Sequence, residues 1–185
     1  NISLRKTLPY HPVRDFTPLM LIASMPNILV THPSLPAKSV KELIAFAKAR
    51  PGQVSYASAG AGTITHLTVE LFLANTGIEM LHVPFKGGAP AIIALVSGQV
   101  QAIFNPIAEI LPHVRAGGKV RTLAVTSPQR VAELAEVPTL AEAGLPDCTV
   151  TTWSWFYAPA GTPRAIIDRL NSEINRIVRQ PEVQE

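Results

Sequence analysis

The sequence has little charge, few aromatic residues and almost no cysteine. Charged residues make up 16% of its 185 residues, aromatic residues make up 6%, and the net charge is only +3. Lysines and arginines are scattered rather than gathered in a stripe between aromatic residues, which argues against a nucleic-acid-binding surface. The single cysteine, Cys148, excludes an internal disulfide and leaves a cysteine-based metal cage without a second ligand.

Long apolar runs are also missing. None approaches the roughly 20 residues that span a bilayer, so we expect no transmembrane helix and no direct membrane insertion. Hydrophobic residues nevertheless form 47% of the chain, which is typical of a domain with a buried core. The chain opens at Asn1 without an apolar signal segment, and residues 2–12 resemble the middle of a surface loop, so we expect a fragment of a longer protein.

Enzyme signatures are absent too. The chain contains no Gly-x-Ser-x-Gly, no His-Glu-x-x-His and no phosphate-binding P-loop. Gly60 and Gly62 do not complete a dinucleotide-binding motif, because Thr65 stands where its third glycine would be. The five histidines show neither metal-ligand spacing nor a neighbouring nucleophile. We therefore expect no catalytic residue, no metal site and no cofactor.

Strand and helix patterns alternate between residues 54 and 126. A short strand at 54–56 leads through a small-residue loop into a helix from Ile64, and the order strand, helix, strand, helix, strand then follows through 80–85, 88–98, 100–104, 106–116 and 120–126. The loops between these elements are too short for anything but right-handed crossovers, in which a helix connects two parallel strands. The pattern therefore predicts an α/β fold with a largely parallel sheet and helices on both faces.

The flanking segments have their own signals. Residues 19–23 and 28–30 predict two strands or one interrupted strand. Ser39 with Glu42, and Thr139 with Glu142, match the capping box that begins a helix. Residues 149–158 predict a long strand, and residues 162–180 predict an amphipathic helix. We expect the apolar residues of that helix to face inward: Ile166, Ile167, Leu170, Ile174 and Ile177.

The loop at residues 58–63 is the main candidate binding loop. Glycines let a ligand approach the backbone closely, and the first N–H groups of the following helix have no partner inside the helix, so the loop is suited to an anion. Ser58 and Thr63 add hydroxyls, and His66 lies one turn into the helix. A tight turn without a ligand has the same pattern, and this alternative stays open.

Two further strand ends carry polar or flexible residues, at 86–88 and at Asn105. Because ligands bind beyond the carboxyl ends of parallel strands, we expect these loops to converge with residues 58–63 on a small anionic ligand. Plainer interpretations remain: Lys86 as an exposed lysine, Asn105 as a helix cap and His66 as a packed core histidine. Of Trp153 and Trp155, we expect one to line a pocket and the other to lie in the core.

Several runs together resemble a known family. They are LPYHPVRDF at 8–16, SLPAKSVKEL at 34–43, SAGAGT at 58–63 with His66-Leu67, HVPFKG at 82–87, GQV at 98–100, LAVTS at 123–127 and VPTLAEAG at 137–144. In this order they resemble the Bug-type solute receptors, the periplasmic binding proteins of tripartite tricarboxylate transporters. The resemblance covers essentially the whole chain.

The resemblance implies a two-lobed periplasmic-binding-protein fold of type II-like form, with one lobe complete and the other partial. Residues 33–152 would form lobe 2, residues 1–32 would be part of lobe 1 and the crossover, and residues 153–185 would return to lobe 1. It implies a periplasmic, non-catalytic receptor that captures a small carboxylate-bearing solute for the membrane permease subunits of its transporter. An α/β transferase or dehydrogenase that uses the glycine loop for a phosphate is the alternative, with Lys86 as its one nearby cation.

The resemblance also implies the solute contacts. The expected binding residues are Ser58, Ala59, Gly60, Gly62, Thr63, His66, Pro84, Phe85, Lys86, Gly87, Asn105 and Trp153. Family members often have tyrosine where this chain has Phe85 and aspartate where it has Asn105, so the roles of these two side chains stay open, as does the identity of the solute.

Overall fold

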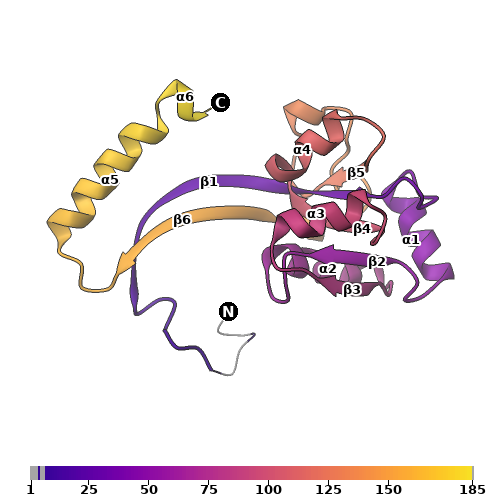
Figure 1. Cartoon of the computed structure of the whole chain (residues 1–185), viewed down its shortest axis with the longest axis horizontal. Helices are drawn as coiled ribbons and strands as arrows, with labels where there is room; N and C mark the ends of the chain where they lie inside the picture. The colour runs from indigo at the N-terminus through magenta and orange to yellow at the C-terminus, as the bar shows by residue number, and fades with distance from the viewer. Residues whose placement is uncertain (1–3, 5–6, 185) are drawn as a thin grey trace. The chain divides into compact units, whose positions relative to one another are not determined.

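The computed structural model describes residue 4 and residues 7–184 of the chain (Figure 1). In chain order the elements are β1 (Phe16–Thr31), α1 (Val40–Ala49), β2 (Ser55–Ser58), α2 (Ile64–Thr76), β3 (Leu81–Pro84), α3 (Gly88–Val96), β4 (Ala102–Pro106), α4 (Ile107–Arg115), β5 (Arg121–Val125), the 3-10 turns η1 (Ala132–Leu134) and η2 (Pro146–Cys148), β6 (Thr151–Pro159), α5 (Arg164–Val178) and α6 (Pro181–Gln184). Backbone contacts divide the chain into two compact units. Unit 2 is Met25–Thr152, and unit 1 combines Asn1–Ser24 with Trp153–Glu185.

Unit 2 is built on a mixed sheet. Its strands lie in the order β3-β2-β4-β1-β5. Strand β2 pairs in parallel with β3 and with β4, whereas β1 is antiparallel to both β4 and β5. The predicted alternation of strands and helices between residues 54 and 126 is confirmed, with four strands running in one direction. The reversed direction of β1 was not predicted, because β1 reaches the sheet without a crossover helix and no local pattern specifies its direction.

Helices cover both faces of this sheet, as the sequence predicted. Along β1, Leu29 packs with residues of α1 and α2, whereas Ile28 and Val30 on the opposite face pack with residues of α3 and α4. Strand β2 divides in the same way, with Tyr56 on the first face and Ala57 on the second. This alternation follows from the two-residue period of a strand, and it gives unit 2 a core on each side of its sheet.

Strand β1 is one continuous strand rather than two. It runs through Pro26, where the sequence allowed an interruption, and its pairing with β4 begins only at Asn27. Proline has no N–H to donate, but its restricted φ suits an extended chain, so Pro26 fits just outside the paired segment.

The two predicted capping boxes have different outcomes. At α1, the Ser39 hydroxyl accepts a hydrogen bond from the Glu42 N–H at 3.2 Å, and the predicted helix follows. At the second box, the N–H of Thr139 and the Glu142 carboxylate form one bond, and the Thr139 hydroxyl and the Glu142 N–H form the other. The residues after Thr139 form only turns, however, so the predicted helix there is wrong. Gly144, with φ of 91°, ends the turn before a helix can extend.

Unit 1 contains the outer part of β1, most of β6, and the helices α5 and α6. The predicted inward face of α5 is only partly confirmed: Ile167 is buried, but Ile166, Leu170 and Ile177 are exposed. The amphipathic pattern is present, but no other described element covers that side of the helix. No helix in the described part of the chain is long and apolar enough to cross a membrane.

The assignment of residues 1–32, 33–152 and 153–185 to two lobes stays a prediction. The expected surface loop at residues 2–12 falls partly on residues 2–3 and 5–6, which lie outside the described residues.

Candidate functional site

The candidate loop lies between β2 and α2, as predicted. Ser58 is the last residue of β2, and Thr63 is the N-cap of α2. Gly60 and Gly62 have φ of 130° and 77°, values that favour glycine. At Gly60 a Cβ atom would lie 3.3 Å from the backbone oxygen of Phe85, so the two neighbouring loops approach closely there.

The loop after β3 lies beside the first loop. The Phe85 N–H donates to the Ser58 backbone oxygen at 3.0 Å, and the Gly87 N–H donates to the Ala59 oxygen at 3.2 Å. Gly87 is the N-cap of α3 and has φ of 118°. The structure therefore brings the segments 58–63 and 84–87 together at one edge of the sheet, which is the arrangement expected for consecutive parallel strands.

The starts of α2 and α3 lack the side-chain cap that α1 has. The Thr63 hydroxyl donates instead to the Gly60 backbone oxygen at 2.7 Å, and Gly87 has no side chain to offer. First-turn N–H groups of a helix have no intrahelical acceptor, and the helix dipole places partial positive charge there. Two neighbouring uncapped helix starts form a region that favours a negatively charged ligand.

Asn105 is a strand residue and not the helix cap that its sequence allowed. It lies in β4, fully buried, and Pro106 is the N-cap of α4. Its side-chain Nδ2 donates to Glu109 Oε2 at 2.9 Å, while its Oδ1 is buried without a partner among the described residues. Gly88 lies at the start of α3. A Cβ atom at this position would collide with the Glu109 carboxylate and would lie 3.7 Å from Asn105 Oδ1. A buried amide oxygen without a donor retains the capacity to accept a hydrogen bond from a ligand or water.

Lys86 and the remaining predicted contacts differ in exposure. Lys86 and Pro84 are exposed, whereas Phe85 is half-buried and packs against the core under α3 and α4. Lys86 forms no salt bridge with any residue that the structure describes. The exposed-lysine interpretation fits this placement, and an ion pair with a ligand stays a prediction.

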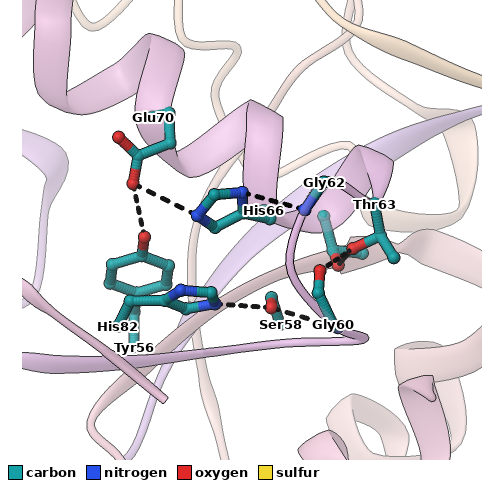
Figure 2. Close-up of polar contacts among 9 residues, drawn as sticks. Tyr56, Ser58, Gly60, Gly62, Thr63, His66, Glu70 and His82 are labelled. Atoms are coloured by element: carbon teal, nitrogen blue, oxygen red, sulfur yellow. Dashed lines mark hydrogen bonds and ion pairs between the residues drawn. The ribbon is translucent and has the colours of Figure 1, made fainter. Parts of the chain in front are cut away.

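His66 is held on both sides of its ring. Nδ1 accepts a hydrogen bond from the Gly62 N–H at 3.3 Å, and Nε2 lies 3.5 Å from Glu70 Oε1 (Figure 2). Accepting at Nδ1 requires the lone pair there, so the proton of the neutral ring is on Nε2, facing Glu70. The ring is therefore more fully satisfied than either sequence interpretation assumed, and its role toward a ligand stays a prediction.

Three further residues complete a stacked cluster that sequence reasoning missed: Tyr56, Glu70 and His82. The rings of Tyr56 and His66 both lie against that of His82, with centroids 4.8 Å and 4.2 Å from the His82 centroid and 6.4 Å from each other (Figure 2). The Tyr56 hydroxyl donates to Glu70 Oε1 at 2.6 Å, and His82 Nε2 lies 2.7 Å from Ser58 Oγ. The available signal was that Tyr56 and His82 each stand two residues before the end of consecutive strands, and that Glu70 is one helical turn after His66.

The cluster changes the acid–base properties of its members. Burial, followed by the charge of His66, holds the pKa of His82 below its usual value, although Glu70 opposes this shift. Burial, followed by the hydrogen bond to Glu70, raises the pKa of the Tyr56 hydroxyl. We conclude that His82 is neutral and Tyr56 protonated at neutral pH.

Trp153 belongs to unit 1, whereas the other predicted contacts belong to unit 2. It is 58% exposed and lines a pocket of about 290 Å³ with Tyr10, Pro12, Phe16 and Tyr157, all from unit 1. Trp153 therefore lines a pocket, as expected of one of the two tryptophans. Trp155 is 39% exposed, so the expectation that the other tryptophan lies in the core is wrong. Strand β6 lacks a covering layer on that side among the described elements.

Comparison with known proteins identifies the family. Residues 3–185 match the family described as tripartite tricarboxylate transporter family receptor. The chain belongs to this family. Protein BugT of Bordetella pertussis is 38% identical over 184 residues, which cover 100% of this chain and 56% of BugT. The family resemblance seen in the sequence is thereby confirmed.

Solved structures of relatives have the same fold. A Rhodopseudomonas palustris protein solved with adipate is 38% identical, with a TM-score of 0.91 over 96% of this chain and 59% of its own. MatC from the same species, solved with bound malate, is 33% identical, with a TM-score of 0.93 over 99% of this chain and 62% of its own. The predicted α/β periplasmic-binding-protein fold is confirmed. The chain spans about half the length of the curated relatives it matches.

The described residues contain no group of three or more histidine, cysteine or acidic side chains that could hold a metal ion. The candidate site combines backbone N–H groups, which favour an anion, with hydroxyls and an amide, which can contact an acceptor or a donor.

Proposed function

We propose that the intact protein is a periplasmic, non-catalytic receptor that captures a small carboxylate-bearing solute and delivers it to the permease subunits of its transporter. The observation that carries the proposal is the pair of uncapped helix starts, α2 and α3, side by side at the carboxyl ends of β2 and β3. They offer backbone donors and partial positive charge, and among the described residues Lys86 is the one cation within these loops, which suits a carboxylate better than a phosphate of higher charge.

Relatives support the choice of ligand class, since one family structure was solved with adipate and another with malate. We expect such a solute to contact the two adjacent loops and the residues beside them: Ser58, Ala59, Gly60, Gly62, Thr63, His66, Pro84, Phe85, Lys86, Gly87 and Asn105. The buried Oδ1 of Asn105 adds an acceptor, which favours a solute that carries a hydroxyl or an amine besides its carboxylate. Trp153 stays a predicted contact from unit 1.

The test is a binding screen of the full-length protein. We expect dicarboxylates such as malate and adipate to raise the melting temperature, because a ligand that binds only the folded state stabilises it, and calorimetric titration then gives the affinity. Nucleotides and sugar phosphates serve as the competing class. Stabilisation by these phosphates alone would overturn the receptor proposal in favour of the phosphate-binding enzyme.

A glycine substitution tests the loop itself. Gly62→Val places a β-branched side chain at φ of 77° in the proposed anion loop, and we expect at least a tenfold loss of solute affinity. Gly52→Val is the matched control, since Gly52 has φ of 70° and open space around it at the far end of α1. Backbone strain should affect both variants, so equal affinities for the two would contradict a binding role for the loop.

A further inference from the structure

The Gly60 N–H is held by Ser58, which contacts His82 of the stacked cluster, and the Gly62 N–H is held by His66 of that cluster. The Gly60 N–H donates to Ser58 Oγ at 3.2 Å, and the Gly62 N–H donates to His66 Nδ1 at 3.3 Å (Figure 2). Both glycines adopt positive φ, a region that glycine reaches as readily as negative φ, so these hydrogen bonds rather than steric limits select the loop conformation. The conformation of the loop therefore depends on the groups that orient Ser58 and His66.

Ser58 is oriented by His82. Its hydroxyl accepts from Gly60, has one proton to donate, and lies 2.7 Å from His82 Nε2. Both hydrogen bonds of the Ser58 hydroxyl form when Nε2 of His82 carries a lone pair, because Ser58 then accepts from Gly60 and donates to His82. Ser58 is fully buried, so water cannot replace His82 as the acceptor of its hydroxyl proton.

Protonation of His82 breaks this arrangement. Nε2 would then become a donor, Ser58 would receive two donors, and the buried hydroxyl proton would lose its acceptor. The titratable groups that face the His82 ring are Tyr56 from β2 and His66 and Glu70 from α2. The His66 ring centroid is only 4.2 Å away, and the charge of His66 acts against a positive charge on His82. The carboxylate of Glu70 contacts both the Tyr56 hydroxyl and His66.

We propose that His82, supported by Tyr56 and Glu70, is a positioning residue that holds the loop at residues 58–63 in its solute-binding form, and that acidification releases the loop and weakens solute capture. The inference rests on the proposed function, because it assigns a purpose to the loop that this function uses. The proposed role of His82 needs no contact between His82 and the solute, because His82 acts through Ser58 and Gly60.

The first experiment measures the loop without a solute. In the full-length protein, hydrogen exchange followed by NMR gives the protection of the Gly60 and Gly62 amides relative to their intrinsic rates. We expect protection of Gly60 to fall at least tenfold in His82→Ala at pH 7.5, and to fall in the wild type as the pH is lowered from 7.5 to 5.5. Unchanged Gly60 protection in His82→Ala overturns the proposal.

The second experiment measures solute affinity against pH, with malate and adipate as probes in calorimetric titration. We expect the wild type to lose affinity between pH 7.5 and 5.5, and His82→Ala to bind about tenfold more weakly at pH 7.5. In His82→Gln, the amide oxygen accepts from Ser58 but does not titrate, so this variant should retain affinity at pH 7.5 and lose less of it than the wild type does as the pH falls to 5.5. A simple packing role for His82 would not produce this split between the two variants.

His32→Gln is the matched control. His32 also pairs with a serine, with Nδ1 2.7 Å from Ser34 Oγ, but it follows Thr31, which pairs with the opposite end of β4 from the loop. Its pH profile should match that of the wild type. A His82→Gln profile identical to the wild type overturns the proposal. If nucleotides and sugar phosphates alone stabilise the protein but His82→Ala still loses Gly60 protection, the proposed function fails while the positioning role of His82 is supported.

Discussion

The hydroxyl of Tyr56 shows how one residue depends on neighbours that are distant in sequence. Its ring is 1% exposed, stacks on His82 and donates to Glu70. Glu70 lies on the following helix and His82 on the following strand, so the environment of Tyr56 arises only when β2, α2 and β3 come together. The raised pKa of Tyr56 is a direct consequence of that assembly.

This shift predicts weaker stability in alkali. Tyrosine in the unfolded chain ionises near pH 10, whereas Tyr56 in the folded protein stays protonated to higher pH, so the free energy of unfolding falls as the pH rises above about 10. Tyr56→Phe should remove this part of the pH dependence and cost about 1 kcal/mol at pH 8 through the lost hydrogen bond. Urea unfolding at pH 8 to 10.5 measures both effects.

Tyr157→Phe is the control, because the Tyr157 ring is exposed. This variant should retain the alkaline loss of the wild type. An equal alkaline slope in Tyr56→Phe and the wild type would show that Tyr56 does not produce it.

At the scale of elements, Asn27 joins four segments of unit 2. Its Nδ2 donates to the Thr68 hydroxyl of α2 at 3.4 Å, and its Oδ1 accepts from Thr152 of β6 at 3.0 Å. Its backbone N–H donates to the hydroxyl of Thr126, just after β5, at 2.9 Å. Asn27 is fully buried at the start of the β1–β4 pairing, so this network ties β1, α2, β5 and β6 together.

We therefore predict that Asn27→Ala destabilises unit 2 by about 2–3 kcal/mol, because it leaves the half-buried Thr152 hydroxyl without its acceptor and the buried Thr68 hydroxyl without its donor. Asn75→Ala is the matched substitution on the exposed side of α2, where Asn75 bonds only the Leu71 oxygen, and it should cost less than about 0.5 kcal/mol. Chemical unfolding of both variants measures the difference. Equal losses would mean that the Asn27 network contributes no more than a surface contact.

At the scale of the whole molecule, apolar exposure is concentrated in unit 1. The exposed apolar side chains of β6, α5 and α6 include Trp153, Trp155, Phe156, Tyr157, Ile166, Leu170, Ile177 and Val183. Unit 2 buries two continuous apolar clusters instead. Faces with this much exposed apolar surface normally pack against another element or another chain.

A polypeptide of these 185 residues expressed by itself should accordingly self-associate, whereas a polypeptide limited to residues 25–152 should be monomeric. Light scattering after size exclusion, over a range of concentrations, measures the mass of each. A monomeric 185-residue chain at about 100 μM with no binding of an apolar dye would contradict the expectation.

The sequence by itself determined the features that depend on residues close together along the chain. The Ser39 cap, the alternation of strands and helices and the two glycine loops follow from local hydrogen bonding, periodicity and backbone freedom. The family resemblance extended this to the fold. The failed helix after Thr139 marks the limit, because a cap can form without enough stabilising contacts to propagate a helix.

Only the tertiary structure decided the direction of β1, the burial of Asn105 and the stack of Tyr56, His82 and His66. Each depends on which strands pair and in which register, and that is a property of chain segments far apart in sequence. Tyr56 faces His82 because β2 and β3 pair in parallel at those two residues, and Asn105 loses its role as a cap because β4 extends through Pro106. Local patterns carry no information on such pairings, because one alternation of apolar residues is compatible with every register that buries the same face of the strand.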